Sequence, residues 1–275
     1  MSDLMYPGPR HRIYSSSQLL VLTIVVLLII VSSGVMFFSA VNYQISANNA
    51  SSQAVASAIA RATSIAQANA SATALASTIH NPYPPYTGNL VLNDPLNGNN
   101  QGNSWDVAST QANNACQFAG SAYESANNNP SKNLYSGNAC FAENTSFANF
   151  TFQVQTTLVQ GLCGGIVFRG DSKANNFDRF EICSNSWYDF RQCSGGYCDV
   201  VFANGLSPVI HTKYGATNTL AVVANDAAIT IYVNGKQIIS ATASGFSQGQ
   251  IGFVTSGYDS TRTVATFRNA QVWAM

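Results

Sequence analysis

Residues 228–243 read AITIYVNGKQIISATA, in which two alternating apolar and polar runs meet at Asn234-Gly235. Alternation with a period of two indicates a strand that buries one face. An Asn-Gly pair between two such runs is the strongest short-range signal for a two-residue hairpin turn. This stretch therefore predicts a β-hairpin with strands over 228–233 and 236–242.

Short runs of the same kind continue through the C-terminal two-thirds of the chain. Runs of β-branched and aromatic residues alternate there with Gly, Asn, Ser and Asp turns, and no helical periodicity is visible. This pattern is typical of a β-sandwich or barrel. The predicted strands are 90–92, 116–123, 139–142, 149–159, 165–169, 178–183, 187–192, 199–203, 218–224, 228–233, 236–242, 250–255 and 263–272.

The N-terminal part of the chain contains one long apolar segment. Residues 19–41 read LLVLTIVVLLIIVSSGVMFFSAV, and no charged residue occurs between Arg12 and Arg61. About 23 apolar residues are enough to cross a hydrocarbon core, whereas a cleavable signal peptide usually has a shorter apolar region. We expect an uncleaved transmembrane helix over 19–41. Arg10 and Arg12 precede it, which predicts a cytoplasmic N-terminal tail over 1–18 and a C-terminal domain outside the cell.

Residues 42–86 are expected to form a stalk. The segment is rich in Ala and Ser, its large apolar residues are few, and the run NPYPPY at 81–86 stops any helix. It would serve as a spacer or as a weakly self-associating helix. The folded domain is then expected over 87–275.

The cysteines point to an oxidising compartment. All six lie in the C-terminal part and their number is even, as a disulfide framework requires. A hairpin turning near Lys173 would place Cys163 opposite Cys183, and Cys193 and Cys198 flank a tight turn, which leaves Cys116 and Cys140. Neighbouring strands thus favour sequential pairing, although the sequence leaves the other connectivities open. Structural zinc is not expected, since CxxC knuckles and paired histidines are missing.

Charge excludes one class of partner. Charged residues make up 9% of the chain and the formal net charge is zero, without a basic stripe. Nucleic acid is therefore not an expected partner.

Several motifs resemble the concanavalin A-like lectin/glucanase superfamily, in particular its laminin-G and "domain of unknown function 1080" branches. They are NTLAVV (218–223), ITIYVNG (229–235), GQIGF (249–253), ATFRNAQVW (265–273), and upstream LNDPL (92–96), WD (105–106) and GGIVFR (164–169). The resemblance implies an all-β fold, a two-sheet antiparallel jelly-roll sandwich. It implies no single activity, because the superfamily contains lectins, adhesion modules, glycanases and sugar-processing hydrolases. The E-x-D-x-x-E motif of the glucanase branch is absent.

A cluster of charged and aromatic residues lies on the middle strands, where such a fold would bind a sugar. The candidate ligand-binding residues are Arg169, Asp171, Arg179, Glu181, Trp187, Tyr188 and Arg191, with Asp178 and Asp189 nearby. Alternation predicts that Arg179 and Glu181 share one face of their strand while Phe180 and Ile182 point into the core. The alternative is a solvated outer face with cross-strand ion pairs.

Other kinds of site have weaker support in the sequence. Catalysis would need a carboxylate pair such as Glu181 with Asp178 or Asp189. His211 is the sole domain histidine and is expected to be structural, as Trp105 and Trp273 are expected to be in the core. No cofactor or metal is expected; calcium would have Asp171 and Asp259 as ligands, but no dense ladder of oxygen donors accompanies them.

The sequence thus favours a membrane-anchored extracellular module that binds carbohydrate or another surface polymer without catalysis. The alternatives are a glycoside-processing hydrolase and a protein-binding adhesion or structural domain. Asn144-Thr145-Ser146 and Asn149-Phe150-Thr151 also match the N-glycosylation pattern.

Overall fold

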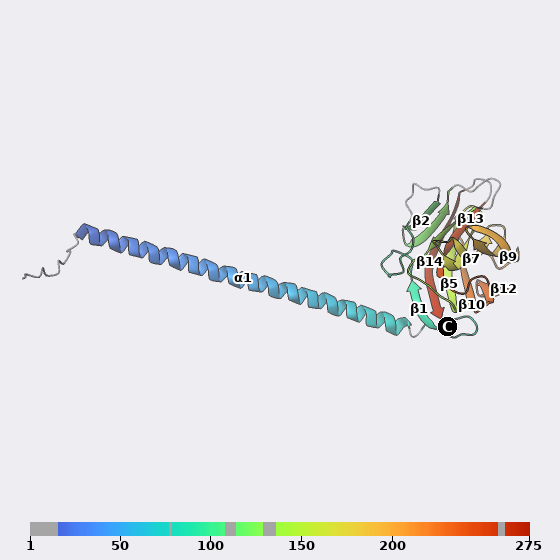
Figure 1. The fold of residues 1–275 in the computed structure, drawn as a ribbon, viewed down its shortest axis with the longest axis horizontal. Helices are drawn as coiled ribbons and strands as arrows, with labels where there is room; N and C mark the ends of the chain where they lie inside the picture. Colours follow the sequence, from blue (N-terminus) through green and yellow to red (C-terminus); the bar gives the residue numbers. More distant parts are fainter. Residues whose placement is uncertain (1–15, 77–78, 108–113, 129–135, 258–261) are drawn as a thin grey trace, which may run out of the picture. The chain divides into compact units, whose positions relative to one another are not determined.

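The computed structural model describes residues 16–76, 79–107, 114–128, 136–257 and 262–275. The chain divides into two compact units, Met1–Ser71 and Ala72–Met275. A single helix, α1 (Ser16–Ala76), contains all the described residues of the first unit (Figure 1). Large apolar side chains of α1, from Ile24 to Phe38, are exposed. In the described part of the chain, no helix combines the length and apolarity that crossing a membrane requires.

The second unit is all β. Its strands are β1 (Asn89–Asp94), β2 (Asn114–Ala119), β3 (Ala122–Asn127), β4 (Ser136–Phe141), β5 (Phe150–Gln160), β6 (Cys163–Asp171), β7 (Asn176–Cys183), β8 (Trp187–Ser194), β9 (Tyr197–Leu206), β10 (Thr217–Asn225), β11 (Ala228–Val233), β12 (Lys236–Thr242), β13 (Gln250–Gly257) and β14 (Thr263–Ala274).

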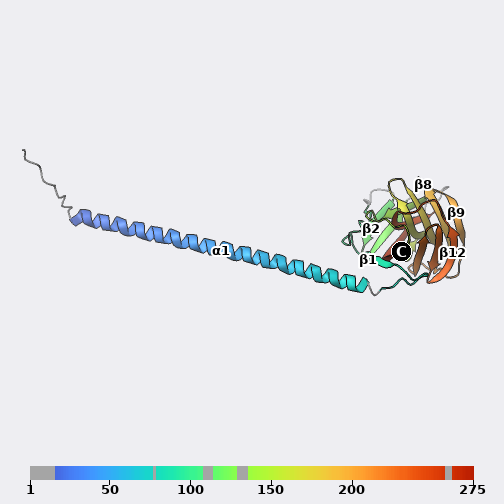
Figure 2. The same ribbon diagram turned by 60° about the horizontal axis from the view of Figure 1, so that its bottom comes forward.

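The strands form two antiparallel sheets. The eight-stranded sheet has the order β12-β11-β10-β5-β14-β3-β2, with β1 paired to β14, and the six-stranded sheet has the order β4-β13-β6-β7-β8-β9. Two apolar sheet faces bury each other in a sandwich of this kind. The edge strands β9 and β12 lie on the same side of the domain (Figure 2). This arrangement is the concanavalin A-like jelly roll that the sequence predicts.

The core between the sheets is built from aromatic and branched side chains. Phe253 stacks on Phe267 with ring centroids 4.2 Å apart and on Trp105 at 4.8 Å. Trp105 and Trp273 are each 1% exposed, which confirms that both are core residues. Burial of such large apolar surfaces is the main stabilising contribution to the fold.

The hairpin predicted over 228–243 is confirmed. Strands β11 and β12 pair with each other, and the turn residues Asn234 and Gly235 have φ angles of 51° and 75°. Two consecutive positive φ angles define the turn type that matches strand twist, and Asn and Gly tolerate them best. By contrast, residues 116–123 are not one strand. They contain the β2–β3 turn at Gly120, whose φ is 62°, which the apolar run concealed.

All three disulfides have the sequential pairing. They are Cys116–Cys140, Cys163–Cys183 and Cys193–Cys198. Cys163 and Cys183 are register partners on β6 and β7, as the expected hairpin requires. Oxidised cysteines indicate that the domain is extracellular.

Residues just before β1 pack on the domain. Tyr83 is 6% exposed and its hydroxyl donates to Gln153 at 2.7 Å. The Asn81 amide donates to Thr151 Oγ1 at 2.9 Å. The sequence assigned these residues to the linker, whereas their side chains contact the eight-stranded sheet.

Candidate functional site

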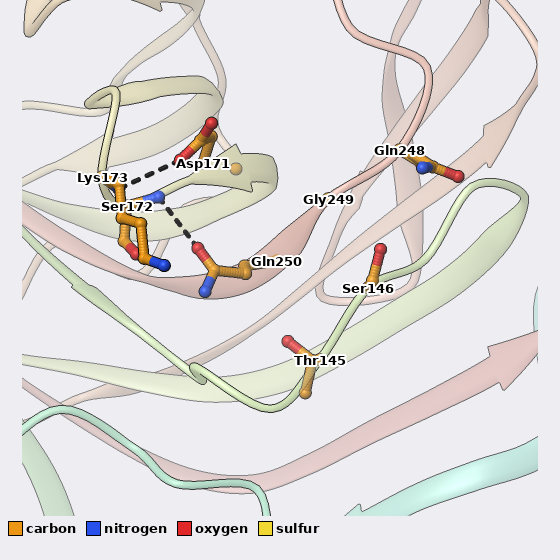
Figure 3. Close-up of a pocket in the computed structure, with 9 residues that line it drawn as sticks. Thr145, Ser146, Asp171, Ser172, Lys173, Gln248, Gly249 and Gln250 are labelled. Atoms are coloured by element: carbon orange, nitrogen blue, oxygen red, sulfur yellow. Dashed lines mark hydrogen bonds between the residues drawn. The ribbon is translucent and has the colours of Figure 1, made fainter.

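A polar groove lies at one rim of the sandwich (Figure 3). It is a cavity of about 340 Å³. Its lining, which defines the rim groove below, is Thr145, Ser146, Gly170, Asp171, Ser172, Lys173, Gln248, Gly249 and Gln250. These residues come from the β4–β5 loop, the end of β6 with the β6–β7 turn, and the segment that leads from the β12–β13 loop into β13.

The β6–β7 turn forms one wall of the groove. Asp171 Oδ1 accepts hydrogen bonds from the amides of Lys173 at 3.0 Å and Ala174 at 3.1 Å. A short side chain that caps its own turn in this way fixes the backbone after a strand. The side chain of Lys173 therefore extends from a well-defined backbone, and its ammonium is a donor that can rotate toward a ligand.

Gln250 connects this turn to the β4–β5 loop. Its Oε1 accepts from the Ser172 amide at 2.9 Å, and its Nε2 donates to Glu143 Oε2 at 2.9 Å. The backbones of Phe147 and Gly249 exchange two hydrogen bonds, of 2.8 Å and 3.1 Å, across the opposite wall. The groove is thus held open by hydrogen bonds within its own rim, while Ser146 and Gln248 stay exposed.

Two carboxyl groups meet beside the groove. Asp106 accepts from the Phe141 amide at 2.9 Å and shares a side-chain hydrogen bond with Glu143. Burial raises the pKa of Asp106; the Phe141 amide lowers it, and the charge and hydrogen bond of Glu143 raise it further. No local sequence pattern indicates this pair, because its members are far apart in the chain.

The candidate cluster from the middle strands divides into separate groups. Asp171 lies at the rim groove. Arg169 and Asp178 lie in the interior, 2% and 0% exposed. Arg179, Glu181 and Arg191 lie on the outer face of the six-stranded sheet, where they meet Asp189.

On that outer face the charged residues form a compact network. Glu181 and Asp189 are register partners on β7 and β8. Arg179 contacts Glu181 Oε2 through Nε at 3.1 Å and Asp189 Oδ2 through Nη2 at 3.1 Å. Arg191 Nε donates to the same Asp189 oxygen at 2.6 Å. The alternation was predicted correctly, since Phe180 and Ile182 lie in the core, but the charged face is nearly closed to solvent except at Arg191.

The two aromatic candidates differ in environment. Trp187 is 37% exposed and pairs across β8 and β9 with the exposed Leu206. Tyr188 packs against the core instead, and its hydroxyl lies near the Gly205 backbone. Trp187 therefore remains available on the surface, whereas Tyr188 has a structural environment.

The remaining candidates have few features of a reactive site. His211 Nδ1 lies 3.0 Å from the Thr217 carbonyl, and the His211 amide donates to Asn218 Oδ1 at 2.8 Å, so the residue holds a loop. Within the described residues no group of three or more His, Cys, Asp or Glu could hold a metal ion. Asp259, named above for calcium, lies outside those residues.

The fold and the site place this domain among two-sheet jelly-roll modules. Residues 93–273 match the family described as "3-keto-alpha-glucoside-1,2-lyase-like domain". The chain belongs to this family. No curated protein matches the chain.

Three similar solved structures come from Bacillus species. A protein of unknown function with galectin-like fold from Bacillus subtilis has a TM-score of 0.52 and 11% identity, covering 71% of this chain and 98% of its own. A carbohydrate binding module from Bacillus subtilis has a TM-score of 0.49 and 20% identity, covering 62% and 96%. Beta-glucanase from Bacillus licheniformis has a TM-score of 0.46 and 13% identity, covering 69% and 100%. At such identities the similarity concerns the fold.

Proposed function

We propose that the β domain is a carbohydrate-binding module without catalytic activity, and that its ligand binds in the rim groove. The observation that carries this proposal is the lining of the groove. Residues with hydroxyl, amide, carboxylate and ammonium groups line one cavity there, whereas Arg179, Glu181 and Asp189 on the outer face are tied to each other.

Sugar hydroxyls match such a lining. Each hydroxyl donates one hydrogen bond and accepts others, so it pairs with amides, hydroxyls and charged groups alike. Ser146 and Gln248 supply exposed donors and acceptors on one side, and Lys173 supplies a charged donor on the other. Because Asp171 and Gln250 are already fixed by hydrogen bonds, binding would not have to order these two side chains.

We propose that the domain is not catalytic because the carboxylates on the outer face are buried and paired with an arginine. Glu181 and Asp189 are register partners, but both are buried and both contact Arg179. A general acid or base must reach a substrate proton. Carboxylates in this position stabilise the six-stranded sheet through their contacts with Arg179 instead.

A second candidate function is glycoside processing at the groove. The specific observation in its favour is the Asp106–Glu143 carboxyl pair, which adjoins the groove through Gln250 and Ser172. A carboxyl group with a raised pKa, as Asp106 has, is suited to general-acid chemistry. The family description names a 3-keto-alpha-glucoside lyase, so a 3-keto-α-glucoside is the substrate to test. Product release that disappears in Asp106→Asn and Glu143→Gln would favour this function over the first.

We also propose that residues 19–41 anchor the module in a membrane, with 1–18 in the cytoplasm and 42–86 as stalk and linker. Support comes from the sequence and from the exposed apolar side chains of α1. A helix with such a surface is stable when lipid or another apolar surface covers it.

A glycan array tests the binding function. The full chain, purified in detergent, is applied beside the double variant Lys173→Ala/Gln248→Ala. The matched control is Lys236→Ala/Gln237→Ala, which removes the same two residue types from exposed positions on β12. Saturable binding by the wild type and the control, lost in the groove variant, is the expected result. An array without saturable binding would contradict the proposed function.

A further inference from the structure

Arg169 occupies an unusual position at the end of β6. Its φ is 50°, and the β6–β7 register slips between Phe168 and Asp171. The slip turns the side chain into the interior, where the residue is 2% exposed. A long charged side chain is rarely buried to this extent unless its donors are satisfied.

The guanidinium of Arg169 contacts three separate loops. Nη1 donates to the carbonyl of Phe246 at 3.1 Å, and Nη2 donates to the carbonyl of Ala148 at 3.2 Å. Nη2 also donates to the carbonyl of Asp226 in the β10–β11 turn. One side chain thus connects the β4–β5 loop, the β10–β11 turn and the β12–β13 loop.

Two of these loops carry walls of the rim groove. Thr145 and Ser146 precede Ala148 by a few residues, and Gln248 and Gly249 follow Phe246. Gly249 also lies against the backbone of Arg169 and Gly170, so closely that a β-carbon would come within 2.3 Å of the Gly170 carbonyl oxygen. The spacing between the walls therefore depends on where the guanidinium sits.

Asp178 lies near this guanidinium without a hydrogen bond of its own. It is 0% exposed, and neither carboxylate oxygen has a hydrogen-bond partner among the described residues. Its register partners are Phe168 on β6 and Gln192 on β8, and Gly245 of the β12–β13 loop closes over Gln192. The charged groups that bear on it are Arg169 and, beyond Arg169, Asp226.

Burial raises the pKa of Asp178 to about 7, against a lowering effect of Arg169. An ionised carboxylate in this place lacks the hydrogen bonds that would offset its lost hydration. A neutral carboxyl is much less costly to bury. Because Asp178 lies near the guanidinium that holds the loops, we expect opening of the loops to admit water to it. Ionisation would then favour the open form, and protonation the closed form.

We propose that Arg169 is the positioning residue of the rim groove, and that protonation of Asp178 controls how firmly the loops above it are held. The inference rests on the proposed function only in that the groove is the ligand site. The loops tighten below neutral pH and loosen above it.

Hydrogen exchange measures this directly and needs no ligand. Exchange of the full chain is followed by mass spectrometry in peptides covering 142–149 and 243–249, at about pH 6 and about pH 8, after correction for intrinsic rates. A group that titrates near 7 in the closed form and near 4 in the open form changes the opening equilibrium by about tenfold over this interval. We expect protection of these two peptides in the wild type to fall by about tenfold from about pH 6 to about pH 8, and to stay constant in Asp178→Asn.

Two controls keep the outcome interpretable. Asp199→Asn neutralises an exposed carboxylate on β9 and should behave as the wild type. Should Asp178→Asn fail to fold, the wild type alone decides, with the peptide of β5 as internal reference. The inference would be overturned if the loop peptides and the β5 peptide showed equal pH dependence. It would also be overturned if a folded Asp178→Asn kept the pH dependence of the wild type.

Arg169 itself is tested through ligand affinity. Arg169→Met should lose glycan binding on the array, and Arg169→Lys should recover part of it, because an ammonium can still donate to one or two of the three carbonyls. Equal binding by Arg169→Met and wild type would contradict the positioning role. If neither the wild type nor any variant bound a glycan on the array, but hydrogen exchange gave the expected result, the proposed function would be rejected. The proton-linked holding of the loops would still be supported.

Discussion

Glu181 and Asp189 face each other on β7 and β8, and the guanidinium of Arg179 contacts both carboxylates at 3.1 Å. Two like charges opposite each other on a sheet are destabilising unless a cation lies between them. Arg179, itself 2% exposed, supplies that cation. The charged residues that looked most like a sugar site thus stabilise one another within the sheet.

Removal of Arg179 tests this interpretation. Arg179→Met leaves two buried carboxylates without their shared cation and should lower the free energy of unfolding by about 3–5 kcal/mol. Arg268→Met, an exposed arginine on β14, should stay within about 0.5 kcal/mol of the wild type. Denaturant unfolding of both variants measures the difference. Similar midpoints for the two would show that the network contributes little.

Asp178 should make stability depend on pH. Its pKa rises from 3.8 to about 7 on folding, so the folded state binds the proton more tightly than the unfolded state. The contribution of Asp178 to the free energy of unfolding should therefore be largest below about pH 4. It should fall as the pH rises and level off above about pH 7. The total decrease over this range is at most about 4 kcal/mol.

Other carboxylates contribute their own pH dependence, so the informative quantity is the difference between wild type and Asp178→Asn. That difference should change steadily between about pH 4 and pH 7 and be flat outside this interval. Thermal and denaturant unfolding at a series of pH values measure it. A constant difference across the series would show that Asp178 does not titrate in this range.

The disulfides should differ in their effect on stability. Cys116–Cys140 closes a loop with a sequence separation of 24 and Cys193–Cys198 one of 5. In the chain-entropy account, replacing the first pair by alanine costs about 3.5 kcal/mol and the second about 2 kcal/mol. Unfolding of the two double-alanine variants provides the test, and the reverse order would speak against a chain-entropy origin.

Gly249 should tolerate no side chain. In Gly249→Ala the new β-carbon would meet the backbone of Arg169 and Gly170, which cannot move as a flexible side chain can. We expect a loss of about 1–3 kcal/mol in stability and a distorted groove. Gly120→Ala is a useful comparison, because nothing lies within 4 Å of its β-carbon position although its φ is also positive. A Gly249→Ala variant as stable as Gly120→Ala would mean that the loops shift easily.

Much of the fold was predictable from local patterns. The alternation around Asn234-Gly235 gave the β11–β12 hairpin, and residue spacing around Lys173 gave the Cys163–Cys183 bridge. The β2–β3 turn was missed because Gly120 is embedded in an apolar run. Local patterns are informative where turn chemistry and periodicity agree, and less so where a single glycine makes the turn.

The site was harder to predict. Alternation correctly separated Arg179 and Glu181 from Phe180, and the same rule places Asp178 inside, a position where a carboxylate is not expected. The rim groove joins loops that are distant in sequence, so only the topology brings Lys173 near Gln248. Asp171 was the one predicted ligand residue that lies there.

The most direct test of the rim groove as the binding site is a calorimetric titration of the full chain with the glycan that binds best on the array. Loss of the side chains in Lys173→Ala/Gln248→Ala should weaken affinity by about tenfold or more, at about 1 kcal/mol for each hydrogen bond removed. Trp187→Ala/Arg191→Ala, on the outer face, should leave affinity unchanged. The opposite pattern, with affinity lost in the outer-face variant and kept in the groove variant, would contradict the assignment and place the ligand on β8.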